Sequence, residues 1–180
     1  EKAIAISPLL MIITGGEPTL HPDFFILVEK AKQENIAIKI LTNGSTLDSD
    51  FLCKLIDVGI NDQDTVQISL DASTEETFFQ QRGSREFPLI CSNIAGLKDA
   101  PFKSEIHFTP TKTNIHQAIE VYELADSMQC DYFSTAALAP IGNATVGQMV
   151  NIELLIIQEM ELLLRSETLN TKYLGSLLSE

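Results

Sequence analysis

The residues with the clearest chemical potential form a short turn, Thr14-Gly15-Gly16-Glu17-Pro18, directly after an apolar stretch. Two glycines let the backbone approach a ligand closely, and Pro18 stiffens the exit from the turn. A phosphate here would meet the Glu17 carboxylate with no Lys or Arg nearby, which is unfavourable without a metal. Backbone carbonyls and a carboxylate instead suit a primary amine. The alternative is a tight strand-to-helix turn in which Glu17 only caps a backbone group.

Strands and helices alternate around this turn along most of the chain. Apolar stretches rich in branched residues predict strands at residues 9–13, 36–41, 66–70, 106–108 and 132–138. Amphipathic spacing and capping residues predict helices at residues 22–34, 48–58, 88–98 and 114–128, the last with Asn114 as N-cap, and a short helix opened by Ser73 and Glu76. Parallel strands need a crossover, and about 30 residues per unit is the usual length. The pattern predicts a parallel α/β sheet, either a partial barrel or an open doubly wound sheet.

A further helix is predicted at residues 151–165, and its apolar residues surround it instead of lining one stripe. They are Leu154, Leu155, Ile156, Ile157, Met160, Leu162, Leu163 and Leu164. A partner or a further segment is therefore expected to cover this helix. The chain opens with Glu1 rather than Met, and we expect a fragment: a barrel core at residues 1–150, then a C-terminal helix and tail at residues 151–180.

Composition excludes several classes of protein. The 180 residues are 44% hydrophobic, and 12 Lys and Arg against 25 Asp and Glu give a net charge of −13. Such a charge disfavours nucleic-acid partners, which select clustered basic residues. No apolar run reaches the roughly 18 residues of a membrane span, so no membrane partner is expected. The odd, sparse set of three cysteines argues for a reducing compartment, and we expect a cytoplasmic protein.

Six ordered segments resemble motifs of the radical S-adenosylmethionine (radical SAM) superfamily. They are Gly15-Gly16-Glu17-Pro18, Thr42-Asn43-Gly44, Ser69-Leu70-Asp71-Ala72, Arg82-Gly83 with Phe87, Thr113-Asn114, and Pro140-Ile141-Gly142-Asn143-Ala144. All but the Arg82 segment, which leads into a helix, follow or end a predicted strand. The resemblance implies a partial (β/α)6 TIM-like barrel with about five of its six βα units present. It is strongest to the branch of peptide-modifying maturases and PQQ-biosynthesis proteins (the SPASM type).

The resemblance also implies roles for the matched positions. Gly15, Gly16 and Glu17, in the turn closed by Pro18, would hold the methionyl amine of SAM. Ser69, together with Arg82, would hold the methionyl carboxylate, and the turn from Pro140 to Gly142 would line the adenine. Thr42 belongs to the same candidate set, and Asn43 and Asp71 would face the cavity, near the ribose or in support of it. The alternative for Asn43 and Asp71 is that they are turn residues bonded to the backbone.

The resemblance implies a second cofactor, a [4Fe-4S] cluster, held in the family by a C-x-x-x-C-x-x-C loop. That loop is absent from this sequence, and we expect its ligands upstream of Glu1. Cys53, Cys91 and Cys130 are instead predicted to be small buried side chains of helices or their ends. The three histidines, His21, His107 and His116, show no metal-ligand spacing, and no metal ligand is expected in this sequence.

The implied activity is that of a radical SAM enzyme whose reduced cluster cleaves SAM to a 5′-deoxyadenosyl radical. The expected partners are a peptide or small-molecule substrate and a reductant such as a flavodoxin or ferredoxin; without cluster ligands, this chain alone is expected to be inactive. Two alternatives stay open at this point. One is a degenerate, non-catalytic barrel that binds a peptide or partner. The other is an ordinary α/β enzyme with a phosphate at Gly15-Gly16.

Overall fold

A computed structural model describes residues 8–136 and 146–174 and shows one parallel sheet of six strands in the order β1-β2-β3-β4-β5-β6. The strands are β1 (Leu10–Ile13), β2 (Ala37–Thr42), β3 (Thr65–Ser69), β4 (Lys103–Phe108), β5 (Tyr132–Thr135) and β6 (Lys172–Tyr173). A doubly wound sheet reverses its strand order, whereas this order follows the chain throughout. The fold is therefore the predicted partial barrel, and the short strand β6 was not predicted from the sequence.

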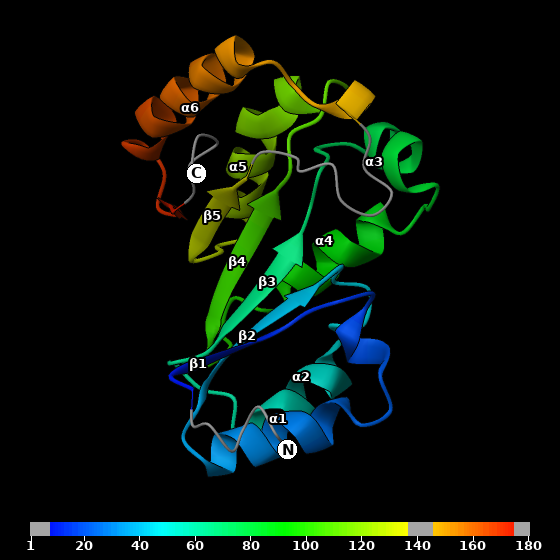
Figure 1. The fold of residues 1–180 in the computed structure, drawn as a ribbon, viewed down its shortest axis with the longest axis vertical. Helices are drawn as coiled ribbons and strands as arrows, with labels where there is room; N and C mark the ends of the chain where they lie inside the picture. The colour runs from blue at the N-terminus through cyan, green and yellow to red at the C-terminus, as the bar shows by residue number, and fades with distance from the viewer. Residues whose placement is uncertain (1–7, 137–145, 175–180) are drawn as a thin grey trace.

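Helices connect the strands and flank the sheet (Figure 1). They are α1 (Phe24–Gln33), α2 (Ser49–Asp57), α3 (Glu75–Arg82), α4 (Phe87–Ala95), α5 (Ala118–Ser127) and α6 (Ile152–Ser166), with 3-10 turns at η2 (Pro18–Leu20), η3 (Ile115–Gln117) and η4 (Val146–Gln148). In Figure 1, α1 and α2 lie by the β1 end of the sheet, and α5 and α6 lie by the β5 end. The predicted helices all exist, with boundaries shifted by a few residues.

Two predicted N-caps differ from the structure. Thr74, not Ser73, caps α3, because its side chain accepts the hydrogen bond from the Thr77 amide. Asn114 caps no helix, since a 3-10 turn separates it from α5 and its amide group bonds elsewhere. The first error is a choice between two neighbouring polar residues, and the second arises from the 3-10 turn before α5; the backbone path decides both.

The two faces of the sheet differ in polarity. Alternate strand residues such as Ile38, Ile40, Val66, Ile68 and Ile106 belong to the buried hydrophobic core that the helices complete. Because side chains alternate across a strand, the residues between them point to the other face, away from that core. That second face, called here the inner face, carries the side chains Lys39, Leu41, Gln67, Ser69, Glu105, His107 and Ser134.

Helix α6 carries apolar side chains on several of its faces, as its sequence predicts, and many of them are exposed. Leu155 and Leu162 are buried, whereas exposed apolar residues are Ile152, Leu154, Ile156, Ile157, Met160, Leu163 and Leu164. Within the described residues, α6 packs against helix α5. None of the helices in residues 8–136 and 146–174 combines the length and the hydrophobicity needed to cross a membrane.

The turn after β2 depends on Gly44, whose backbone φ is +82°. A Cβ here would lie 2.8 Å from Ile68 Cγ2 and 3.3 Å from Ile90 Cγ2. We expect Gly44→Ala to lower the free energy of unfolding by about 2 kcal/mol, from left-handed strain plus crowding of the core. Gly83, with φ +66° and no atom within 4 Å, is the matched control, and Gly83→Ala should cost about 1 kcal/mol. Equal losses in urea denaturation would show that the core contact carries no cost.

Candidate functional site

The Glu17 carboxylate joins the ends of β1 and β2. Its Oε1 accepts hydrogen bonds from Thr42 Oγ1 at 2.7 Å and Thr19 Oγ1 at 2.5 Å, and its Oε2 accepts one from the Asn43 amide at 2.7 Å. Glu17 is also the N-cap of η2. The capping role that the sequence left open is therefore present. Oε2 has a single described donor, so this oxygen can accept one more from a ligand.

The glycines before Glu17 leave open space at the end of β1. Gly15 and Gly16 have φ of +101° and +51°, and a Cβ on either would meet no atom within 4 Å. Pro18 is buried behind them at the start of η2. A cavity of about 400 Å³ adjoins this turn, and Gly15, Glu17 and Pro18 contribute to its lining. A ligand can therefore approach the backbone closely at this strand end.

Thr42 and Asn43 face the same turn but are engaged with the chain itself. Thr42 Oγ1 donates to Glu17 and also accepts from the Gly44 amide at 3.1 Å. The Asn43 side chain accepts from the Ser45 amide at 2.9 Å, which is the turn role considered as its alternative. These residues fix the edge of the site, and their polar groups are largely satisfied within it.

A second group of polar side chains lies at the ends of β3 and β4. Arg82 Nη2 donates to Asp71 Oδ2 at 2.8 Å and to the Ser69 carbonyl at 3.1 Å. Asp71 Oδ1 accepts from the Thr109 amide at 2.9 Å, and Asn114 Nδ2 donates to the Asp71 carbonyl at 3.0 Å. Ser69, Asp71 and Arg82 are thus brought together, and Arg82 makes both of these hydrogen bonds through one terminal nitrogen.

The positioning role of Asn114 was missed in the sequence, where it was interpreted as a helix cap. Its side chain bonds to the carbonyls of Asp71 and Thr109 and accepts from the Thr111 amide at 2.5 Å. It is fully buried. A buried amide with three backbone partners fixes the loops after β3 and β4 relative to each other.

The inner face carries a chain of polar contacts that the sequence analysis also missed. Lys39 Nζ lies 2.7 Å from Glu105 Oε2, Ser134 Oγ donates to Glu105 Oε1 at 2.5 Å, and His107 Nδ1 lies 2.9 Å from Ser134 Oγ. These residues come from β2, β4 and β5. The alternating polar residues at 103–107 were the signal in the sequence for a polar face of this strand. Their partners could not be predicted, because they lie 27 to 66 residues away in the sequence.

The cysteines and the last motif complete the predicted positions. Cys130 is buried and Cys91 is partly buried, but Cys53 is exposed, so the prediction of burial was wrong for Cys53. Burial raises the pKa of the Cys130 thiol to about 12, which disfavours the thiolate that a metal needs. Within residues 8–136 and 146–174, no group of His, Cys, Asp and Glu is placed to hold a metal ion. Pro140 and Gly142 lie outside the described residues.

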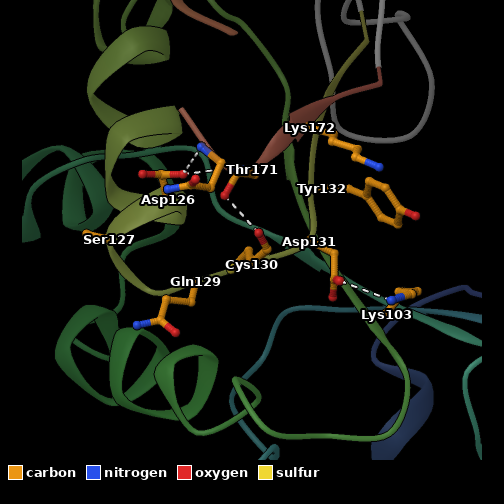
Figure 2. Close-up of a pocket in the computed structure, with 10 residues that line it drawn as sticks. Lys103, Asp126, Ser127, Gln129, Cys130, Asp131, Tyr132, Thr171 and Lys172 are labelled. Atoms are coloured by element: carbon orange, nitrogen blue, oxygen red, sulfur yellow. Dashed lines mark hydrogen bonds and ion pairs between the residues drawn. The ribbon is translucent and has the colours of Figure 1, made fainter. Parts of the chain in front are cut away.

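A second cavity, about 540 Å³, lies at the opposite end of the sheet (Figure 2). Lys103, Tyr132 and Lys172, which begin β4, β5 and β6, line it. Figure 2 shows Lys103 paired with Asp131, at 3.3 Å. Amino-terminal strand ends of such barrels serve stability, whereas ligands bind at the carboxyl ends. The candidate site is therefore the edge formed by Glu17, Asn43, Asp71 and Arg82.

Comparison with known proteins decides the family. The family model described as the Radical SAM superfamily matches residues 6–125, which hold β1 to β4 and the strand-end residues above. The chain belongs to the radical SAM superfamily. Members of this superfamily are enzymes that use SAM and a [4Fe-4S] cluster.

Curated relatives of the radical SAM chain have several activities. It is 26% identical over 143 residues to the AdoMet-dependent heme synthase of Methanosarcina barkeri, covering 79% of this chain and 40% of the relative. It is 34% identical over 114 residues to the mycofactocin maturase MftC of Mycobacterium tuberculosis strain H37Rv, covering 63% and 28%. The chain therefore spans well under half the length of these relatives.

Solved structures share the fold. Streptococcus suis SuiB bound to its precursor peptide SuiA superposes with a TM-score of 0.81 at 20% identity, over 97% of this chain and 40% of SuiB. SuiB bound to S-adenosylmethionine gives a TM-score of 0.77 at 20% identity, over 97% of this chain and 39% of SuiB. At this identity the likeness shows the fold alone.

The described residues fit one of the two family cofactors. Open backbone at Gly15 and Gly16, a free acceptor position on Glu17 and the Arg82 guanidinium suit the amine and the carboxylate of the methionyl group of SAM. They do not fit the cluster, because Cys53, Cys91 and Cys130 lie on separate elements and form no ligand group. A [4Fe-4S] cluster would have to be bound by other residues.

Proposed function

We propose that this chain is the SAM-binding barrel of a radical SAM enzyme that modifies a peptide. The observation that carries the proposal is the charge arrangement at one edge of the sheet. A carboxylate, Glu17, stands at the end of β1, and a guanidinium, Arg82, reaches the end of β3. An amino acid group carries the complementary pair of charges, so the methionyl end of SAM can lie across the end of β2 between them.

Each candidate residue has a defined task in this proposal. Glu17 Oε2 and the carbonyls near Gly15 and Gly16 accept from the methionyl amine, while Pro18 fixes the turn. Arg82 donates to the methionyl carboxylate with the Ser69 hydroxyl beside it, and Asp71 orients the guanidinium through the 2.8 Å ion pair. Asn43 and Thr42 keep Glu17 in position through hydrogen bonds to its carboxylate. Pro140 and Gly142 complete the proposed set at the adenine.

Bound SAM and a reduced cluster supply a 5′-deoxyadenosyl radical that abstracts hydrogen from the substrate. The share of this chain is to bind SAM, orient it and enclose the reaction. The proposed cluster is held by residues outside this chain, and its electron comes from a flavodoxin or ferredoxin in the cytoplasm.

The peptide substrate is supported by two relatives. MftC is a maturase, and SuiB has been solved with a precursor peptide. The heme synthase similarity keeps a small-molecule substrate as the second class. The sequence identity to the maturase MftC, 34%, exceeds the 26% identity to the heme synthase, which favours the peptide.

The test is anaerobic incubation of the full-length protein, with its cluster reconstituted, with SAM and dithionite. We expect 5′-deoxyadenosine to accumulate, measured by liquid chromatography with mass detection, and a matched sample without dithionite to form none. Retained SAM binding by calorimetry without 5′-deoxyadenosine would instead favour the degenerate, non-catalytic barrel. Absence of SAM binding would reject the proposal.

A further inference from the structure

The inner face presents one imidazole whose orientation is set by its neighbours. His107 is on β4, directly across from Ser69 on β3 and Ser134 on β5 in the strand register. The contact chain runs from Lys39 through Glu105 and Ser134 to Nδ1 of His107. Three strands therefore fix one ring, so its remaining nitrogen, Nε2, has a defined place on the inner face.

The same contacts determine which nitrogen carries the proton. Glu105 is paired with Lys39 at 2.7 Å, so its carboxylate accepts hydrogen bonds. The Ser134 hydroxyl has one proton, which it donates to Glu105 at 2.5 Å. Ser134 Oγ must then accept from His107, which places the ring proton on Nδ1. In the neutral ring, Nε2 is left with its lone pair, and it makes no hydrogen bond within the described residues.

The charged groups around the ring lie on β2, after β3 and on β4 itself. Desolvation lowers the pKa of His107, the charge of Lys39 on β2 also lowers it, and the charges of Asp71 after β3 and Glu105 on β4 raise it. Together these effects lower the pKa of His107 from its usual value. The folded protein therefore keeps this imidazole neutral at pH values where an ordinary histidine already gains a proton, and protonation begins only as the pH falls through the lowered value.

We propose that His107 Nε2 is the hydrogen-bond acceptor for an N–H or O–H group of the substrate on the inner face. This inference rests on the proposed function. The candidate contacts to the methionyl group of SAM come from the ends of β1, β2 and β3, whereas His107 and Ser134 lie on β4 and β5, the next strands along the sheet. A peptide offers a backbone N–H at nearly every residue, which suits a fixed acceptor. Ser134, Glu105 and Lys39 act through His107 and are positioning residues.

The first test needs no substrate. Diethyl pyrocarbonate acylates unprotonated imidazole nitrogen, and peptide mapping by mass spectrometry reports His21, His107 and His116 separately. An imidazole with a pKa near 6.5 loses about three quarters of its reactivity between pH 7.5 and pH 6.0. For His107 in the folded full-length protein we expect a smaller loss than for the reference, N-acetylhistidine, because its pKa is lowered. A loss equal to that of the reference would overturn the proposal.

Two variants test the orientation. Glu105→Gln gives the Ser134 hydroxyl no charged acceptor, so it can donate to Nδ1 and move the ring proton to Nε2. We expect at least a threefold slower acylation of His107, and Ser134→Ala should change it in the same direction. Circular dichroism checks that each variant is folded. One folded variant is enough to test which nitrogen of His107 carries the proton. Unchanged acylation in a folded variant would refute the assigned proton position.

Added ligands separate the possible donors. SAM should change acylation of His107 by less than twofold, whereas a peptide that increases 5′-deoxyadenosine formation should protect it more than fivefold. Strong protection by SAM alone would assign Nε2 to the cofactor and overturn the substrate assignment. If SAM does not bind but the pH and variant results hold, the proposed function fails while the acceptor geometry stands. The failures of the two proposals are therefore distinguishable.

Discussion

Glu17→Ala is expected to weaken SAM binding by about 1–3 kcal/mol, or roughly five- to 150-fold in Kd, the usual range for removing a charge-assisted hydrogen-bond partner. The substitution removes the only carboxylate in the turn and leaves the methionyl amine with backbone carbonyls alone. Calorimetric titration of the full-length protein with SAM measures the change directly.

Thr19→Val is the matched control for this variant. It removes the 2.5 Å hydrogen bond to Glu17 Oε1 and loosens the same turn, but it keeps the carboxylate. We expect about 1 kcal/mol lower stability and a change in SAM affinity of about threefold or less. If Glu17→Ala binds SAM as tightly as the unchanged protein, Glu17 is only a structural clamp between β1 and β2.

Asp64→Asn is expected to lower the free energy of unfolding by about 3–5 kcal/mol, the range for breaking a buried ion pair by removing one partner. The Asp64 side chain is 1% exposed and lies 2.8 Å from Lys32 Nζ, which is itself 9% exposed. The carboxylate also accepts from the amides of Ile38 and Asn61, both at 2.8 Å. An amide at this position leaves the Lys32 charge buried without a counterion and turns a donor toward other donors.

Asp62→Asn in the same loop provides the comparison, because Asp62 is exposed. We expect it to change stability by less than about 0.5 kcal/mol. Urea denaturation followed by circular dichroism gives both values. A loss below about 1 kcal/mol for Asp64→Asn would mean that the loop before β3 does not depend on this ion pair.

The sequence predicted the alternation of elements well, and for a local reason. Strands β1 and β2 are largely apolar runs, and α2 and α6 begin at the side-chain caps Asp48 and Asn151. These signals lie within about ten neighbouring residues, so they can be read without knowing the fold. The cap error at Ser73 arose where two polar neighbours compete for one amide, and the error at Asn114 arose from the 3-10 turn before α5.

The candidate site was predicted only in part. Motif order identified Gly15, Glu17, Asn43, Asp71 and Arg82, and the structure gathers these residues along one edge of the sheet. Their partners could not be predicted, because a contact such as Asp71 with the Thr109 amide joins residues 38 positions apart. The bridging role of the Asn114 side chain likewise becomes visible only when the loops after β3 and β4 are placed together.

By itself, the sequence determined the superfamily, the parallel α/β class and the strand-end residues, since each depends on local periodicity and short ordered motifs. Only the tertiary structure decided that the sheet keeps chain order, that Asp64 and Lys32 form a buried pair and that Lys39, Glu105, Ser134 and His107 share the inner face. The physical reason is register: side chains on neighbouring strands meet only when the pairing of those strands is fixed, and that pairing follows from burial of the whole sheet against its helices.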